Sequence, residues 1–133
     1  MRFLDANVFL FARLDEGSRG DAARRLLRAV DGANPAATTA VVLDEVLWNL
    51  RKPLGRDAAL QRSQQLSVMP GLRILPIGER EWIRALGLMA GHAHLKPNDA
   101  LHAAAAMEAG IATIVSTDDD FDELPGLRRE GLL

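Results

Sequence analysis

Met1-Arg2-Phe3-Leu4-Asp5-Ala6-Asn7-Val8-Phe9-Leu10 is the stretch around which the fold is organised. A short apolar run ends at the carboxylate of Asp5, and Asn7 then precedes a second apolar run. Such a short run next to a polar residue predicts a buried strand over residues 2–4. Open α/β sheets bind ligands at the carboxyl ends of their strands, so Asp5 is predicted to lie at a ligand-binding edge.

Strands and helices alternate along the rest of the chain. Apolar runs predict further strands over residues 36–38, 72–77 and 112–116. Helical periodicity and capping residues predict helices over residues 7–14, 19–30, 40–50, 56–66, 79–90 and 99–109. The tail, residues 124–133, has the pattern of one last weak strand or helix. This alternation predicts an α/β fold with a mainly parallel sheet, and the length predicts one domain over residues 1–133.

The composition excludes some kinds of chemistry. The 133 residues include no Cys, which excludes disulfides, thiolate–metal sites and a Cys nucleophile. The net charge of −2 argues weakly against nucleic acid, but the first 70 residues carry ten basic and eight acidic side chains. A moderately basic surface can therefore form from Arg13, Arg19, Arg24, Arg25, Arg28, Arg51, Lys52 and Arg56. No secretory signal or membrane-length apolar run is visible, which favours a cytoplasmic protein.

Four acidic residues are predicted to meet at one edge of the sheet. Asp5 ends the first strand, and Asp118 follows the strand predicted over residues 112–116. Helices that connect parallel strands begin near the carboxyl edge of the sheet. Asp99 lies in the first turn of such a helix, and Glu45 lies near the second turn of another. All four carboxylates are therefore expected to face the same rim.

Crowded carboxylates favour a bound cation. They repel one another, and at least one pKa is expected to rise when no cation is present. Oxygen ligands without Cys or a His pair suit Mg²⁺ or Mn²⁺. Such a metal lowers the pKa of water, orients it and stabilises charge on a leaving oxygen, as phosphodiester hydrolysis requires.

The same residues carry a resemblance to a known family. The stretches are Asp5-Ala6-Asn7, Thr38-Thr39-Ala40-Val41-Val42-Leu43-Asp44-Glu45-Val46-Leu47, Asn98-Asp99-Ala100-Leu101-His102-Ala103-Ala104 and Val115-Ser116-Thr117-Asp118-Asp119-Asp120-Phe121. Together they resemble a PIN domain, and the short chain is similar to the VapC toxin ribonucleases of VapBC toxin–antitoxin pairs. The resemblance implies a three-layer α/β/α sandwich with a mainly parallel sheet of four to five strands. The family often ends in a further strand, which the tail matches poorly.

The resemblance also implies roles for matching residues. The metal-site acids of the family match Asp5, Glu45, Asp99 and Asp118. Asn7 and Ser116 match polar groups that support the site, although the family usually has Thr where Ser116 stands. Asp120 matches an extra acid that is frequent in the family. By the same resemblance, the chain is expected to be an Mg²⁺- or Mn²⁺-dependent endoribonuclease toxin. Its expected partners are an RNA substrate, a VapB-like antitoxin that covers the acids, and a second copy in a homodimer.

Alternatives remain open at several positions. Asp44, about 100° around the helix from Glu45, competes with it as the ligand, although the family pattern favours Glu45. Asp5 and Asp99 can also act as helix-capping residues.

His102, one turn after Asp99, can face the site or the sheet, and a partly buried, hydrogen-bonded histidine is favoured. Trp48 and Trp82 are interpreted as packing residues, with a partner groove as the alternative for Trp48.

Three other kinds of site or protein fit these residues poorly. The acidic run that starts at Asp118 does not match a calcium loop, which needs Gly and Glu where Glu123 and Arg129 stand. An aspartyl-phosphate phosphatase needs a second Asp where Asn7 stands. A phosphoreceiver module needs adjacent acids after the first strand and a Lys later than Lys96. A catalytically silent PIN-like module that binds RNA or regulates remains the main alternative.

Overall fold

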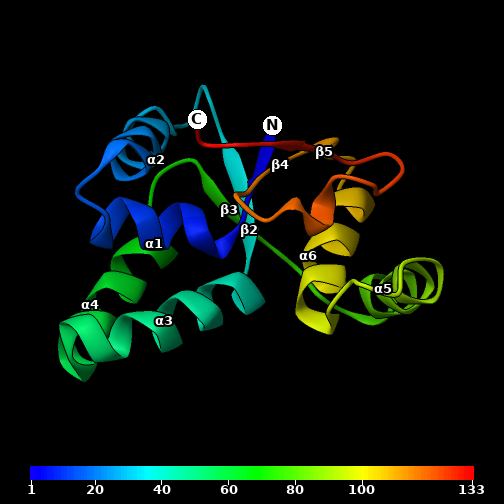
Figure 1. Cartoon of the computed structure of the whole chain (residues 1–133). Coiled ribbons are helices and arrows are strands. Elements are labelled where there is room, and N and C mark those ends of the chain that lie inside the picture. The colour runs from blue at the N-terminus through cyan, green and yellow to red at the C-terminus, as the bar shows by residue number, and fades with distance from the viewer.

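Five parallel strands form the central sheet (Figure 1). The computed structural model describes residues 1–133. The strands are β1 (Arg2–Leu4), β2 (Ala36–Thr39), β3 (Leu72–Leu75), β4 (Thr113–Val115) and β5 (Arg128–Glu130). Their order across the sheet is β3-β2-β1-β4-β5, so the first strand of the chain is the central one. This central position explains why Phe3 and Leu4 of β1 are apolar and fully buried.

Helices cover the sheet on both sides. They are α1 (Ala6–Leu14), α2 (Ser18–Arg28), α3 (Ala40–Leu54), α4 (Arg56–Ser67), α5 (Glu79–Gly91) and α6 (Pro97–Glu108), with a short 3₁₀ helix η1 (Asp119–Phe121). Figure 1 shows α1 to α4 towards one side of the sheet and α5 and α6 towards the other. Helix α1 packs on α2, α3 on α4, and α5 on α6. The predicted three-layer α/β/α architecture is confirmed.

The core extends over both faces of the sheet, and the part that positions the site lies where β1 and β4 meet α6. Phe3 and Leu4 of β1 and Ile114 and Val115 of β4 are fully buried. The face of α6 against them is made almost entirely of small side chains, which let the helix approach the sheet closely. These are Ala100, Ala103, Ala104, Ala105 and Ala106, all buried. This close approach brings the first turns of α6 up to the end of β1.

Several boundaries differ from the predicted ones, and three of these differences have a clear physical reason. Strand β3 ends at Leu75 rather than 77, because Pro76 cannot donate a ladder hydrogen bond, and it is an edge strand as proline suggests. Helix α3 continues past residue 50 and ends only at Gly55, whose φ of 84° suits glycine. Helix α6 begins at Pro97, where a proline in the first turn loses no helical hydrogen bond. The tail forms a strand, β5, beside β4.

The interpretation of both tryptophans as packing residues is wrong, because neither is buried. Trp48 on α3 is 64% exposed and Trp82 on α5 is 48% exposed. The Arg51 guanidinium lies 3.6 Å from the centre of the Trp48 ring, one turn further along α3. None of the helices combines the length and apolar composition needed to cross a membrane.

Candidate metal centre

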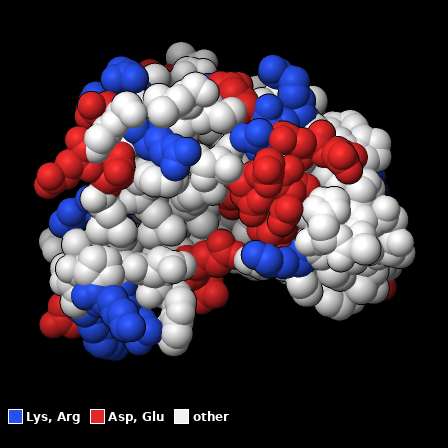
Figure 2. Space-filling view, in the orientation of Figure 1, with Lys and Arg blue, Asp and Glu red and all other residues white.

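The four predicted acids line one cavity of about 220 Å³. Asp5 follows β1, Glu45 lies in the second turn of α3, Asp99 in the first turn of α6, and Asp118 beyond β4. The other lining residues are Ala6, Asn7, Leu10, Lys96 and Asn98. Figure 2 shows acidic side chains along the hollow between the two helical halves of this face, with basic side chains beside them. The structure therefore brings together all four carboxylates that the sequence placed at one rim.

Asp5 is held rigidly at the end of β1. Its carboxylate caps α1, because Oδ1 accepts a hydrogen bond of 2.8 Å from the Ala6 amide. Oδ2 accepts one of 2.7 Å from the Ser116 hydroxyl. Burial raises the pKa of Asp5, and the nearby His102 ring and the Ser116 hydrogen bond partly oppose that rise. Asp5 is thus both the capping residue and a wall of the cavity.

A small polar network supports this carboxylate. Ser116 Oγ accepts hydrogen bonds from Asn7 Nδ2 at 3.2 Å and from the Asp118 amide at 3.0 Å. Asn7 Oδ1 in turn accepts a weaker one from the Thr117 amide at 3.3 Å. Asn7 and Ser116 therefore connect the start of α1 to the loop after β4. Both residues lie where the sequence predicted supporting groups for Asp5.

Glu45, rather than Asp44, lies in the cavity. Its Oε1 accepts a hydrogen bond from the Asn98 side-chain amide, whereas Asp44 is exposed and does not line the cavity. Burial acts to raise the pKa of Glu45, but the neighbouring His102 ring and the Asn98 amide outweigh it and lower that pKa. Glu45 is therefore held ionised by groups on α6.

Asp99 is placed differently from Glu45. It is 7% exposed, and its carboxylate accepts no hydrogen bond from the protein. Burial, followed by the negative charge of Asp5, raises the pKa of Asp99 to about 6. The residue before α6 is Lys96, so the interpretation of Asp99 as the helix-capping residue is wrong.

The titratable side chains of the site form two groups. In each group, one ligand atom from every residue lies within 4.8 Å of the others. The groups are Asp5, Glu45 and His102 on one side, and Asp99, Asp118 and Asp120 on the other. Asp120 was expected as an extra acid and is found beside Asp118, whose Oδ1 accepts a hydrogen bond from the Asp120 amide at 3.0 Å.

His102 faces the site, one of the two orientations that the sequence left open. It was expected to be partly buried and hydrogen-bonded, but it is fully buried and neither ring nitrogen has a hydrogen-bond partner. Nε2 lies 3.4 Å from Glu45 Oε1 and 3.9 Å from Asp5 Oδ1. The signal was present in the sequence, because a residue three positions after Asp99 shares its helix face.

The donor set fits a hard divalent cation. The carboxylates around the cavity offer oxygen ligands, which Mg²⁺ and Mn²⁺ prefer. The raised pKa of the buried Asp99 shows that the cavity disfavours its own negative charge. A bound cation removes that cost by offsetting the charge.

Comparison with known proteins places these residues in a family context. The PIN domain family matches residues 2–127 of the chain. Ribonuclease VapC13 of Mycobacterium tuberculosis is 29% identical over 130 residues, which cover 97% of this chain and 98% of that protein. The VapC ribonuclease Mb1869c of Mycobacterium bovis has the same identity and coverage.

Solved structures share the fold. VapBC2 from Rickettsia felis, bound to a DNA fragment from its promoter, gives a TM-score of 0.78 at 19% identity, covering 98% of this chain and 97% of that chain. VapC20 of Mycobacterium tuberculosis, a toxin that cleaves the sarcin–ricin loop, gives a TM-score of 0.77 at 19% identity, with 90% and 92% covered. The fold and the resemblance stated from the sequence are thereby confirmed, and the match over residues 2–127 shows that this chain belongs to the PIN domain family.

Proposed function

We propose that the protein is a metal-dependent endoribonuclease of the VapC type, the toxin of a type II toxin–antitoxin pair. Residues 1–133 act as one domain in the cytoplasm. The proposed ligands of Mg²⁺ or Mn²⁺ are Asp5, Glu45, Asp99 and Asp118. The observation that carries this proposal is that carboxylates from four separate segments line one cavity. The VapC ribonucleases among its relatives support the choice of RNA as substrate.

The protein's own groups prepare this site for hydrolysis. When bound, the divalent cation supplies a more acidic water and offsets charge on the leaving oxygen. Asp5 is fixed by the Ser116 hydroxyl, and Glu45 is kept ionised by its neighbours on α6. Asp99, whose pKa is about 6, gives up any remaining proton when a cation enters.

The surface near the cavity offers groups that suit single-stranded RNA. Lys96 lines the cavity and supplies a positive charge for a phosphate. Trp48, one turn beyond Glu45 on α3, exposes its ring beneath the Arg51 guanidinium. Aromatic rings and Arg planes are the surfaces on which unpaired bases stack.

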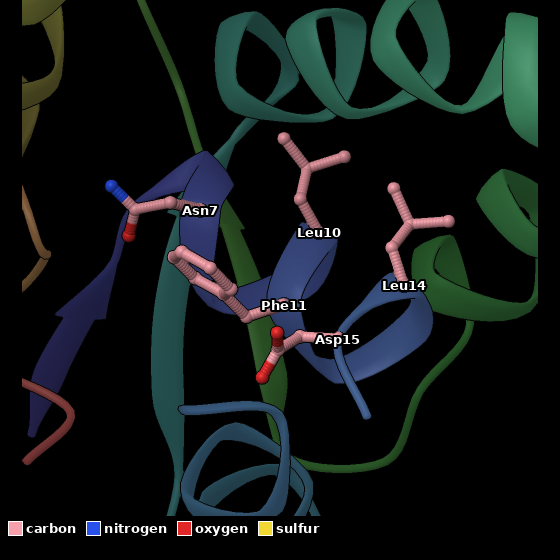
Figure 3. Close-up of a pocket in the computed structure, with 5 residues that line it drawn as sticks. All are labelled: Asn7, Leu10, Phe11, Leu14 and Asp15. Carbon is pink, nitrogen blue, oxygen red and sulfur yellow. The ribbon is translucent and has the colours of Figure 1, made fainter. Parts of the chain in front are cut away.

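A pocket beside the acids suits the proposed antitoxin. It has a volume of about 290 Å³ and is lined mainly by apolar side chains of α1, with Asn7 at one end (Figure 3). The lining residues are Asn7, Leu10, Phe11, Leu14 and Asp15. Because Asn7 and Leu10 also line the carboxylate cavity, a segment bound here reaches the acids directly. A VapB-like segment would place apolar side chains in the pocket and a basic one among the carboxylates, on each copy of a homodimer.

RNA cleavage with and without metal tests this proposal. We expect cleavage of single-stranded RNA in Mg²⁺ or Mn²⁺, loss of cleavage in EDTA, and loss in Asp5→Asn. Asp119→Asn is the matched control, because Asp119 is exposed and does not line the cavity. Cleavage that persists in both EDTA and Asp5→Asn contradicts the mechanism. Absence of divalent binding by calorimetry would favour a silent RNA-binding module instead.

A further inference from the structure

His102 lies buried between two of the proposed metal-site carboxylates. Its Nε2 is 3.4 Å from Glu45 Oε1 and 3.9 Å from Asp5 Oδ1. The other side of its ring faces the core, where the Phe3 ring centre is 6.2 Å away. Neither ring nitrogen makes a hydrogen bond. His102 is therefore a polar side chain aimed at the acids from within the core.

The fold gains little from an imidazole at this position. A buried polar atom without a partner destabilises the folded state, and such atoms are rare in native proteins. The neighbours of His102 along α6, from Ala103 to Ala106, are all buried alanines. An apolar side chain of similar size would suit these surroundings better. The reason for a histidine here must therefore lie with the two carboxylates.

His102 stands behind the carboxylates rather than among the ligands. Asp5 and Glu45 line the cavity, but His102 does not, and both of its nitrogens are inaccessible. In metal sites, buried donors in this position orient the ligands and tune their basicity. We propose that His102 is a positioning residue whose Nε2–H holds the Asp5 and Glu45 carboxylates in the arrangement that binds the cation. This inference rests on the proposed metal-dependent function.

Helix α6 holds Glu45 from two sides. Asn98 and His102 are four residues apart, so they lie on the same face of this helix. The Asn98 amide donates to Glu45 Oε1 from the cavity side, and His102 approaches the same oxygen from the core side. Because α6 also carries Asp99, one helix provides a ligand and positions another that belongs to α3.

Metal affinity measured without turnover tests this role. We expect His102→Leu to weaken the binding of both Mg²⁺ and Mn²⁺ to the full chain by about 10- to 100-fold in calorimetry, as removal of a supporting partner usually does. The melting temperature of the metal-free variant should change little, because removing a buried polar group without a completed hydrogen bond offsets the lost contact with Glu45. A histidine with a purely structural role would give the opposite pair of results.

A conservative pair of variants identifies the nitrogen involved. His102→Gln places an amide N–H near the position of Nε2 and should restore most of the lost affinity. His102→Asn ends closer to the backbone, near the position of Nδ1, and should not restore it. His92→Leu is the matched control, because His92 bonds the Leu88 carbonyl of its own helix and does not line the cavity. It should bind metal like the parent.

Three results would overturn the inference. The first is a His102→Leu variant with the metal affinity of the parent. The second is a Gln variant as weak as the Leu variant. The third is loss of Mn²⁺ binding alone with Mg²⁺ binding kept, which would make His102 a nitrogen ligand. If the parent itself binds no divalent cation and cleaves no RNA, the proposed function fails, and that outcome is distinct from these three.

Discussion

The two sides of the cavity differ in how the protein treats their charge. On the first side, Asp5 accepts hydrogen bonds from Ala6 and Ser116, and Glu45 accepts one from Asn98. On the second side, Asp118 accepts one from the Asp120 amide, but the carboxylate of Asp99 accepts none and faces the charges of Asp5 and Asp118. The fold thus fixes Asp5 and Glu45 with its own donors and leaves the charge of Asp99 to be offset by a cation.

Removing a carboxylate from the second side is the strongest way to test this difference. We expect Asp99→Asn to lower the rate of RNA cleavage by about 100- to 1,000-fold, the usual loss when one electrostatic contact at the reacting centre is removed. The rise in melting temperature on adding metal should disappear as well, since that rise reports cation binding. Asp119→Asn, an exposed neighbour of Asp118, should keep both. A parent-like metal response in Asp99→Asn would remove Asp99 from the site.

The pH dependence of stability sharpens the same comparison. The pKa of Asp99 is about 6 in the folded chain, against an ordinary value of 3.8. As pH rises from about 4 to 6, the unfolded chain loses this proton first, so the metal-free folded state loses stability. The full cost, up to about 3 kcal/mol, applies above pH 6 and is absent below pH 4.

Urea unfolding in EDTA at pH 4 and pH 7 measures this cost. As pH rises, the unfolding free energy of Asp99→Asn should increase relative to that of the parent. Comparing the two proteins at each pH cancels the contributions of the carboxylates that do not interact with Asp99, so the difference reports Asp99 together with its neighbours Asp5, Glu45 and Asp118. A difference that is the same at both pH values would show that Asp99 is not strained by burial and crowding.

The sequence best predicted the residues whose place is set by the path of the backbone. Asp5 ends an apolar run, and the ends of parallel strands must share an edge with the starts of the connecting helices. That geometry alone predicts that Glu45, Asp99 and Asp118 meet Asp5 at this edge, where they line one cavity. The sequence could not show that α6 approaches β1 closely enough to turn His102 towards the acids. The spacing of Asp99 and His102 puts them on one helix face, but how closely that face approaches β1 depends on the packing of the alanines, which no local pattern reports.

Two other features of the fold, one left open by the sequence and one wrongly interpreted, have a different cause. Strand β5, Arg128-Arg129-Glu130, has no apolar alternation, because an edge strand can be held by main-chain pairing with β4. Trp48 and Trp82 were interpreted as packing residues, but both are exposed, and aromatic side chains are also enriched at binding surfaces. These features depend on neighbours or partners rather than on local sequence.

On the side of Asp5 and Glu45, Ser116→Ala should have an intermediate effect on stability and on RNA cleavage. The Ser116 hydroxyl donates to Asp5 and accepts from Asn7 and from the Asp118 amide. Its removal leaves these groups unpaired and should lower the unfolding free energy by about 1–2 kcal/mol, with slower cleavage, because Asp5 is no longer fixed. Ser116→Thr keeps the hydroxyl and should restore both in chemical denaturation and cleavage assays. An unchanged Ser116→Ala variant would show that Asp5 needs no support.

The smallest effect is expected just outside the first side, at Asp44. This side chain is exposed and does not line the cavity, whereas the next residue, Glu45, lines it and accepts a hydrogen bond from Asn98. Asp44→Asn should therefore change the unfolding free energy by less than about 0.5 kcal/mol and leave cleavage and metal affinity at parent values. Glu45→Gln, the same chemical change one residue along α3, should weaken both. If the two variants exchange these results, the ligand on α3 is Asp44, and the donors that surround Glu45 serve the packing of α6 against α3 instead of the metal.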